Sequence, residues 1–159
     1  MDTEDTSLKT ACTLVPAQSF NLLIPNCCIA EVLIHTIISS SSPDNSWYIG
    51  NTLWNGEEIP IISFEKLDPA YSFKQKDKSI IVIVNYPSPD KSKIFHFGIM
   101  ANQFPQVVQA NNQTIDRELN PKNSHQYALS YVYIDGKSAL IPDLPRITNS
   151  MLRNLRKSA

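Results

Sequence analysis

The feature that most limits the fold of this chain is a series of short apolar runs separated by turn-forming residues. The runs are rich in β-branched and aromatic side chains, which is typical of strands. They lie at residues 20–24, 59–64, 80–84, 94–100 and 129–134. Many short strands with little helix predict an all-β, mainly β fold, built as a barrel or a sandwich.

The segments between these runs contain the residues that turns prefer. Residues 39–46, 86–92, 111–112 and 120–124 are rich in Ser, Pro, Asp and Asn. The dipeptide Asp135-Gly136 predicts a β-hairpin between residues 129–134 and 137–141, because Asp-Gly readily takes the positive φ values of a tight turn.

Helix is predicted in two places only. Residues 26–33 follow Pro25 and are compatible with a short helical turn. Residues 147–157 predict a terminal helix with Thr148 or Asn149 as its N-cap. The apolar residues of this second segment form one stripe, so we expect the helix to pack on the barrel.

Length and charge indicate one soluble domain. A chain of 159 residues has about the size of a single domain, so we expect a flexible N-terminus at residues 1–10 and one domain at residues 11–159. The net charge of -1 offers no extended positive field for nucleic acid. The longest apolar stretch, residues 22–38, contains Pro25 and Glu31, which argues against a membrane span.

The cysteines and the N-terminus indicate the cytoplasm. The chain has three cysteines, an odd number, and adjacent Cys27 and Cys28 point to opposite faces of an extended strand, so we expect no disulfide framework. Residues 1–10 lack the basic start and apolar middle of a secretory signal. Free thiols agree with a reducing compartment.

A search for catalytic or cofactor motifs finds none. The four glycines, Gly50, Gly56, Gly98 and Gly136, form neither a P-loop nor a dinucleotide fingerprint. The histidines have no metal-ligand spacing with the cysteines, so no zinc site is predicted. The acidic pairs Glu57-Glu58 and Asp116/Glu118 are interpreted as solvated turns rather than as catalytic carboxylates. We therefore expect no enzyme activity and no cofactor.

The most informative segment is residues 47–64. It predicts an aromatic strand, a sharp turn at Asn55-Gly56 and a second apolar strand in which Pro60 suits an edge or bulge. Trp54 lies in this hairpin, where an aromatic ring either plugs a barrel or anchors a partner. The order resembles the signature of the CheW-like domain family, and the match runs through Gly50, Trp54, Gly56, Ile59 and Pro60.

Two other segments extend this resemblance to about residues 11–150. Residues 22–32 look like the family's "Ile-Pro, then Val-x-Glu-Val" segment, and residues 94–108 and 130–141 look like its second barrel half and closing strands. The motifs Leu-Ile-Pro-Asn and Ile-Pro-x-x-Ser-Phe-Glu, with the Phe-Pro pair, look closest to ChpC-type proteins of the chemosensory systems that control type IV pili.

The resemblance implies a fold of two intertwined five-stranded SH3-like β-barrels with a short C-terminal helix. It also implies a non-catalytic adaptor that couples the cytoplasmic tip of a methyl-accepting chemoreceptor to the regulatory domain of a CheA-type histidine kinase. The interaction residues that it implies, together with Trp54 from the hairpin, are Ile29, Glu31, Val32, Gly50, Trp54, Asn55 and Gly56. The chain departs from the family in one of these positions, because an Arg in the turn is replaced by Asn55, which makes no charged contact.

Three alternatives remain open at this point. A CheW-like protein can keep the fold and lose receptor coupling. A β-barrel can bind a small ligand in an apolar cavity with converging polar groups. A thiol-dependent enzyme would need a reactive cysteine, such as Cys28 meeting His96 in space.

Overall fold

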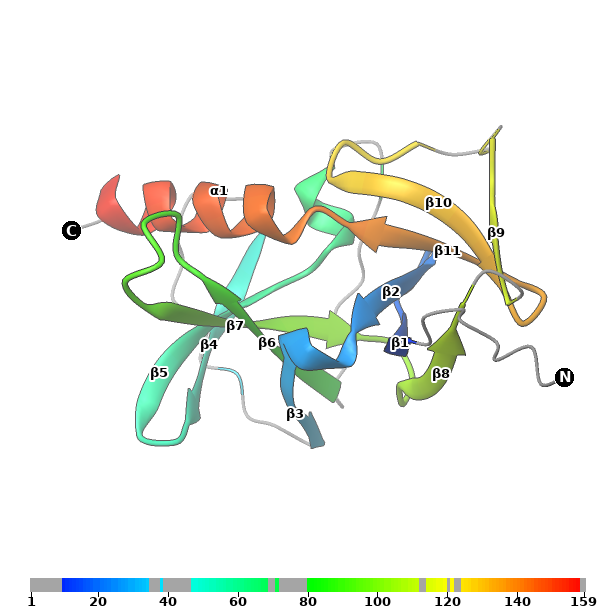
Figure 1. Ribbon diagram of the computed structural model, residues 1–159. Helices are drawn as coiled ribbons and strands as arrows, with labels where there is room; N and C mark the ends of the chain where they lie inside the picture. The colour runs from blue at the N-terminus through cyan, green and yellow to red at the C-terminus, as the bar shows by residue number, and fades with distance from the viewer. Residues whose placement is uncertain are drawn as a thin grey trace, which may run out of the picture.

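The computed structural model describes residues 10–34, 38, 47–68, 71, 80–111, 114–119, 121 and 124–157. The expected flexible segment at residues 1–10 lies outside these residues except for Thr10, and the expected turn-rich segment at residues 39–46 also lies outside them. The elements, labelled in Figure 1, are β1 Thr10–Pro16, β2 Asn21–Pro25, η1 Asn26–Cys28, β3 Ile29–Ile34, β4 Tyr48–Trp54, β5 Glu57–Ile62, η2 Glu65–Leu67, β6 Ile80–Pro87, β7 Ile94–Ala101, β8 Gln106–Ala110, β9 Ile115–Arg117, β10 Ala128–Ile134, β11 Lys137–Pro142 and α1 Leu144–Lys157.

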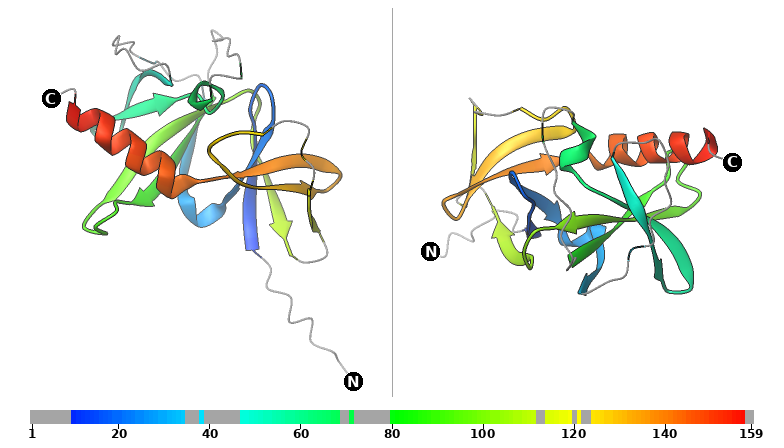
Figure 2. Two further views of the ribbon diagram at one scale, coloured as in Figure 1. Left: turned by 90° about the horizontal axis from the view of Figure 1, so that it is seen from above. Right: turned by 180° about the vertical axis from the view of Figure 1, so that it is seen from behind.

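The strands form two sheets that share one chain in an interleaved order (Figures 1 and 2). The first sheet has the order β8-β1-β2-β11-β10-β9, and the second has the order β3-β6-β7-β5-β4. The chain therefore starts in the first sheet, builds the whole second sheet and returns. This confirms the mainly β fold with a C-terminal helix. The second sheet has the five expected strands, and the short β9 gives the first sheet a sixth.

Both predicted hairpin turns are confirmed. Asn55-Gly56 joins β4 to β5, and Asp135-Gly136 joins β10 to β11, each with positive φ at both residues. Six strands lie outside the five apolar runs, and two of these, β4 and β11, were predicted as hairpin partners. The other four are β1, β3, β8 and β9. The helical turn expected at residues 26–33 is limited to η1, because pairing with β6 draws the rest of this segment into β3.

The predicted terminal helix is present but begins earlier than expected. It starts at Leu144, and the Asp143 carboxylate accepts a hydrogen bond from the Arg146 backbone N–H at 3.1 Å, as an N-cap does. The prediction of Thr148 or Asn149 as N-cap is therefore wrong, since both lie inside the helix. The missed signal is Asp143 two residues before Pro145, a pattern typical of helix starts.

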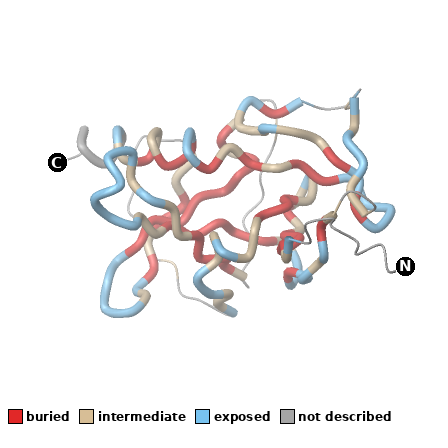
Figure 3. The backbone as a smooth tube through the Cα atoms, viewed as in Figure 1, coloured by how far each residue is buried: buried red, intermediate tan, exposed pale blue. Residues whose placement is uncertain are grey.

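Buried residues follow the inner strands and one side of α1 (Figure 3), and among the described residues they form three groups. A central core lies between the sheets and includes Leu22 and Ile24 of β2, Val82 and Val84 of β6, and residues of α1. Each sheet also curls around an interior of its own, which makes it a barrel. The first-barrel interior contains Cys12, Leu14, Leu23, Ala110, Val132, Ile134 and Ala139. The second-barrel interior contains Ile49, Ile59, Ile61, Ile81, Ile83 and Met100.

His125 is buried between the end of β5 and the start of β10, and its hydrogen bonds set its tautomer. The Tyr127 backbone N–H donates to Nδ1 at 3.0 Å, so Nε2 carries the ring proton and donates to the Phe64 carbonyl at 3.0 Å. Burial lowers the pKa of His125, while the Phe64 carbonyl and the Asp68 and Glu65 carboxylates act in the opposite direction. The folded protein therefore favours the neutral ring.

A neutral His125 predicts that acid weakens the fold below about pH 6.5, the ordinary pKa of histidine in an unfolded chain. Below that pH the unfolded chain binds a proton at this residue and the folded protein does not, so the free energy of unfolding falls. The loss, at most about 1.4 kcal/mol per pH unit, continues down to the lowered folded pKa and then levels off. Urea unfolding at about pH 7 and about pH 5 should show a smaller loss for His125→Gln than for the wild type. Equal losses in the two proteins would contradict this role for His125.

Candidate functional site

Two of the predicted interaction residues meet across the second barrel. Glu31 lies on β3 and Trp54 on β4, which are the two edge strands of the second sheet. The indole Nε1–H of Trp54 donates to Glu31 Oε2 at 2.5 Å. The curl of the sheet thus brings together two segments that the sequence separates by 23 residues. Within the described part of the chain β3 and β4 do not pair as strands, and this side-chain hydrogen bond joins the two edges instead.

On β3, a bulge sets the direction of the predicted site residues. The pairing with β6 shifts between Ile29 and Glu31, so Ala30 is the extra residue. The extra residue places Ile29 and Val32, three positions apart, on the same side, where both are half-buried against the central core. Glu31 is exposed. Of these three residues, Glu31 is therefore the most available to a partner.

Trp54 belongs both to the barrel interior and to its surface. The side chain is half-buried and packs against the second-barrel interior. Its ring lies over His96 of β7 with the centroids 5.0 Å apart and the planes tilted by 50°. Trp54 thus closes one end of the barrel while its indole N–H reaches the exposed carboxylate of Glu31.

His96 is a member of this site that the sequence analysis did not assign. It pairs with Asn85 in the register of β6 and β7. The signal was available, because alternation along β7 places His96 on the same face as Gly98 and Met100, which face the second-barrel interior. We name Glu31, Trp54 and His96 the barrel-end site.

The turn beside the barrel-end site explains why asparagine fits there. Asn55 has φ 49° and Gly56 has φ 77°, and asparagine is among the few non-glycine residues that take this left-handed conformation at low cost. Both residues are exposed. Gly50, by contrast, is buried inside β4, next to the point where its pairing with β5 shifts. Gly50 therefore belongs to a strand and not to the turn.

Pro60 lies in a part of β5 where strand pairing requires few backbone N–H donors. β5 pairs with β4 along most of its length but with β7 only at Ile61 and Ile62. At Pro60 the strand is thus bonded on one side, which a residue without an N–H tolerates. The prediction of an edge or bulge position is therefore wrong, since β5 is an interior strand and its register with β4 is regular at Pro60, but the residue is tolerated because β7 does not pair there.

The surface around the barrel-end site is acidic and partly apolar. Strand β3 and residues 48–62 contain Glu31, Glu57 and Glu58, all exposed, and no Lys or Arg. Next to Trp54, the Leu53 side chain is 73% exposed. A partner surface with basic groups around an apolar centre would complement this arrangement.

The cysteines do not form a reactive site with His96. All three thiols are free, and Cys28 Sγ lies 4.0 Å from Cys27 Sγ while its side chain packs against the central core. Burial, and then the neighbouring Cys27, raise the pKa of the Cys28 thiol to about 11, which disfavours the nucleophilic thiolate. His96 instead lies against Trp54.

Two further features concern metals and membranes. Within the described part of the chain, no group of three or more His, Cys, Asp or Glu side chains is arranged to hold a metal ion. Among the same residues, no helix combines the length and the apolar character that crossing a membrane requires.

Comparisons with known proteins agree with this architecture. A family model described as the CheW-like domain matches residues 12–151. Among solved structures, the chain is similar to the crystal structure of the scaffolding protein TtCheW from Thermoanaerobacter tengcongensis, with 14% sequence identity and a TM-score of 0.68. That match covers 86% of this chain and 90% of the other. No curated protein sequence matches the chain significantly.

Proposed function

Because this chain belongs to the CheW-like domain family, we propose that it is a chemosensory adaptor that binds partners and catalyses no reaction. In this proposal, separate patches bind the regulatory domain of a CheA-type histidine kinase and the cytoplasmic tip of a methyl-accepting chemoreceptor. The signal then passes as a change in occupancy or orientation. The protein would act in the cytoplasm, as one domain made of two β-barrel subdomains at residues 11–159.

The observation that carries the proposal is the hydrogen bond from Trp54 to Glu31. It joins the two segments that the family resemblance implies as interaction surfaces, the Val-x-Glu-Val segment and the hairpin turn. The proposed interface contains Glu31, Trp54, Asn55 and Gly56 at the surface. Ile29 and Val32 support it from the core side, and the buried Gly50 shapes β4.

The resemblance to ChpC-type proteins extends the proposal to systems that control type IV pili and twitching motility. At the hairpin turn, the receptor contact in this proposal differs from the one in the family, because the amide of Asn55 replaces an arginine guanidinium. The three exposed carboxylates around it favour a partner surface with Lys or Arg side chains.

Reversing the charge at Glu31 is the direct test. Calorimetric titration of the kinase regulatory domain and of a receptor-tip fragment should give a micromolar Kd for at least one partner. Glu31→Arg should weaken that binding by about ten-fold or more, the effect of losing roughly 1.4 kcal/mol at an interface. The variant places a like charge opposite the partner's basic groups and also removes the acceptor for the Trp54 indole.

The matched control is Asp116→Arg, the same charge reversal on exposed Asp116 of β9 in the other sheet. It should leave the Kd almost unchanged. Trp54→Phe keeps a ring beside His96 and removes only the indole donor, so a smaller loss of affinity is expected. Equal weakening by Glu31→Arg and Asp116→Arg, or no binding to either partner, would contradict the proposal.

A further inference from the structure

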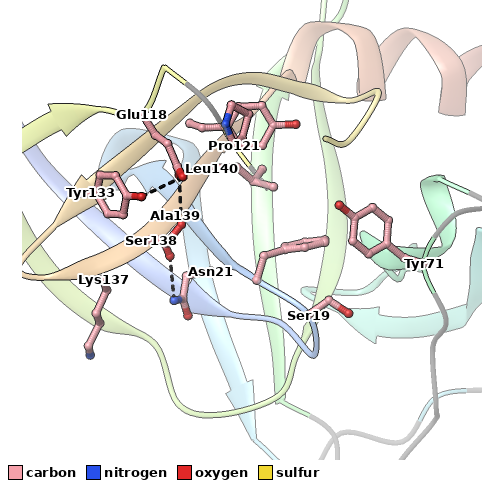
Figure 4. Close-up of a pocket in the computed structure, with 12 residues that line it drawn as sticks. Ser19, Asn21, Tyr71, Glu118, Pro121, Tyr133, Lys137, Ser138, Ala139 and Leu140 are labelled. Carbon is pink, nitrogen blue, oxygen red and sulfur yellow. Dashed lines mark hydrogen bonds between the residues drawn. The ribbon is translucent and has the colours of Figure 1, made fainter. Parts of the chain in front are cut away.

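The first sheet carries a second candidate site, independent of the barrel-end site and of the proposed function. A cleft of about 510 Å³ lies between the β1–β2 turn, strands β10 and β11, Tyr71, Glu118 and Pro121 (Figure 4). This volume is in the range of pockets that hold small molecules. Figure 4 shows Glu118 and Tyr133 near one end of the cleft and Tyr71 near the other.

Glu118 is held in place by both its backbone and its side chain. Its backbone N–H donates to the Tyr131 carbonyl at 2.8 Å. The Tyr133 hydroxyl donates to Oε1 at 2.8 Å, and the Ser138 hydroxyl donates to Oε2 at 3.4 Å. An ionised carboxylate has about four acceptor positions, so each oxygen keeps capacity for a further donor. Glu118 follows β9, is half-buried, and makes solvent-exposed hydrogen bonds to β10 and β11, so the interpretation of a solvated residue outside the strands fits it. Asp116, the other member of the pair, lies on β9 rather than in a turn.

Aromatic rings form much of the remaining wall. Phe20, Tyr71, Tyr131 and Tyr133 all line the cleft. The three tyrosine hydroxyls have protein partners: Tyr71 donates to the Ser124 carbonyl at 3.1 Å, Tyr131 contacts the His125 backbone, and Tyr133 contacts Glu118. With the hydroxyls so held, the rings offer their faces and edges to a ligand, and a ring face attracts positive charge.

The charge that the cleft presents to a ligand is negative and comes from Glu118. Glu118 is the one acidic residue among the described lining residues, and Lys137 is the one basic residue. The Lys137 ammonium donates to Gln106 Oε1 of β8 at 3.2 Å, and Figure 4 shows its side chain extending away from Glu118. The positive charge is therefore bound at β8, while the negative charge lies beside Tyr133 at one end of the cleft.

We propose that this cleft binds an organic cation, an alkylammonium or guanidinium group, with Glu118 as the counter-ion and the tyrosine rings as the cation–π surface. The cation belongs either to a free small molecule or to a basic side chain of a partner protein. In both cases the ligand donates to, or lies against, the Glu118 carboxylate while its hydrocarbon part contacts Phe20 and Leu140.

An NMR titration of the isotope-labelled full chain tests the proposal. The probes are choline, its neutral isostere with carbon in place of nitrogen, and N-acetyl-arginine amide. At least one cation should shift the amide signals of the cleft residues, and the neutral isostere should bind roughly ten-fold more weakly than choline. Preference for choline indicates a free small molecule, and preference for the arginine amide indicates a protein side chain.

Variants separate this site from non-specific binding. Glu118→Gln keeps the size of the side chain and removes its charge, so cation affinity should fall about ten-fold. Glu58→Gln removes an exposed carboxylate from the other sheet and should change nothing. Lys137→Met should leave cation affinity unchanged or raise it, which gives a second readout if Glu118→Gln folds poorly. The absence of shifts with either cation, or equal binding of choline and its neutral isostere, would overturn the proposal.

Discussion

Replacing Phe64 by alanine is expected to lower the free energy of unfolding by about 3–5 kcal/mol, the largest loss predicted for a single side chain here. Phe64 is fully buried in the central core, two residues after the end of β5. Its ring stacks on His125 with centroids 4.3 Å apart and meets Phe20 edge-on at 5.4 Å. Both partners flank strands of the first sheet, Phe20 before β2 and His125 before β10, whereas Phe64 follows β5 of the second sheet. The variant would therefore leave a cavity at the point where the barrels join.

Urea unfolding with circular dichroism would measure this loss. The matched control is Phe95→Ala, because Phe95 is also an aromatic residue against the central core but is only half-buried. A half-buried ring loses less transfer free energy and leaves a site that water fills, so its loss should be clearly smaller. A Phe64→Ala protein that unfolds at the same urea concentration as Phe95→Ala would contradict the role of Phe64 in joining the barrels.

Adding a single methyl group at Gly98 is expected to cost about 1–3 kcal/mol. Gly98 lies on β7 and faces the second-barrel interior. A Cβ built there would lie 2.4 Å from Ile61 Cδ1 and 2.6 Å from Ile81 Cγ2. Both distances are far below van der Waals contact, and these isoleucine side chains are fully buried, so they have little room to move.

A double-mutant cycle makes this prediction specific. Ile61→Val removes Cδ1, the atom nearest to the added methyl group, so Gly98→Ala should cost less in the Ile61→Val background than in the wild type. The control is Gly136→Ala, where a new Cβ meets nothing within 4 Å and the cost comes only from the φ of 74°. If the losses in free energy of unfolding caused by Gly98→Ala and Ile61→Val simply add in the double mutant, the close approach to Ile61 is unimportant.

Some features of the fold follow directly from local sequence. Asn55-Gly56 and Asp135-Gly136 specify their tight turns, because few other dipeptides take positive φ twice at low cost. The apolar runs specify strands since their side chains pack well on a pleated sheet. The resemblance to the CheW-like family was also readable, because its motifs lie on contiguous segments around residues 22–32 and 47–64.

Other elements were missed because their stability comes from distant partners. β3 was expected to contain a helical turn, but its backbone pairs with β6, which lies about fifty residues further along the chain. Strand β9 is only three residues long and is held by β10. Local sequence patterns do not predict such strand pairings, since their hydrogen bonds form only after the chain has closed long loops.

The sequence by itself determined the mainly β class, the two hairpin turns and the family resemblance, because each rests on neighbouring residues. Only the tertiary structure decided that Glu31, Trp54 and His96 share one barrel end, and that Glu118 lines one cleft together with three tyrosines. The physical reason is that the curl of each sheet and the bulge on β3 set which side chains meet. Those are properties of strand pairing across the whole domain, and no single segment contains them.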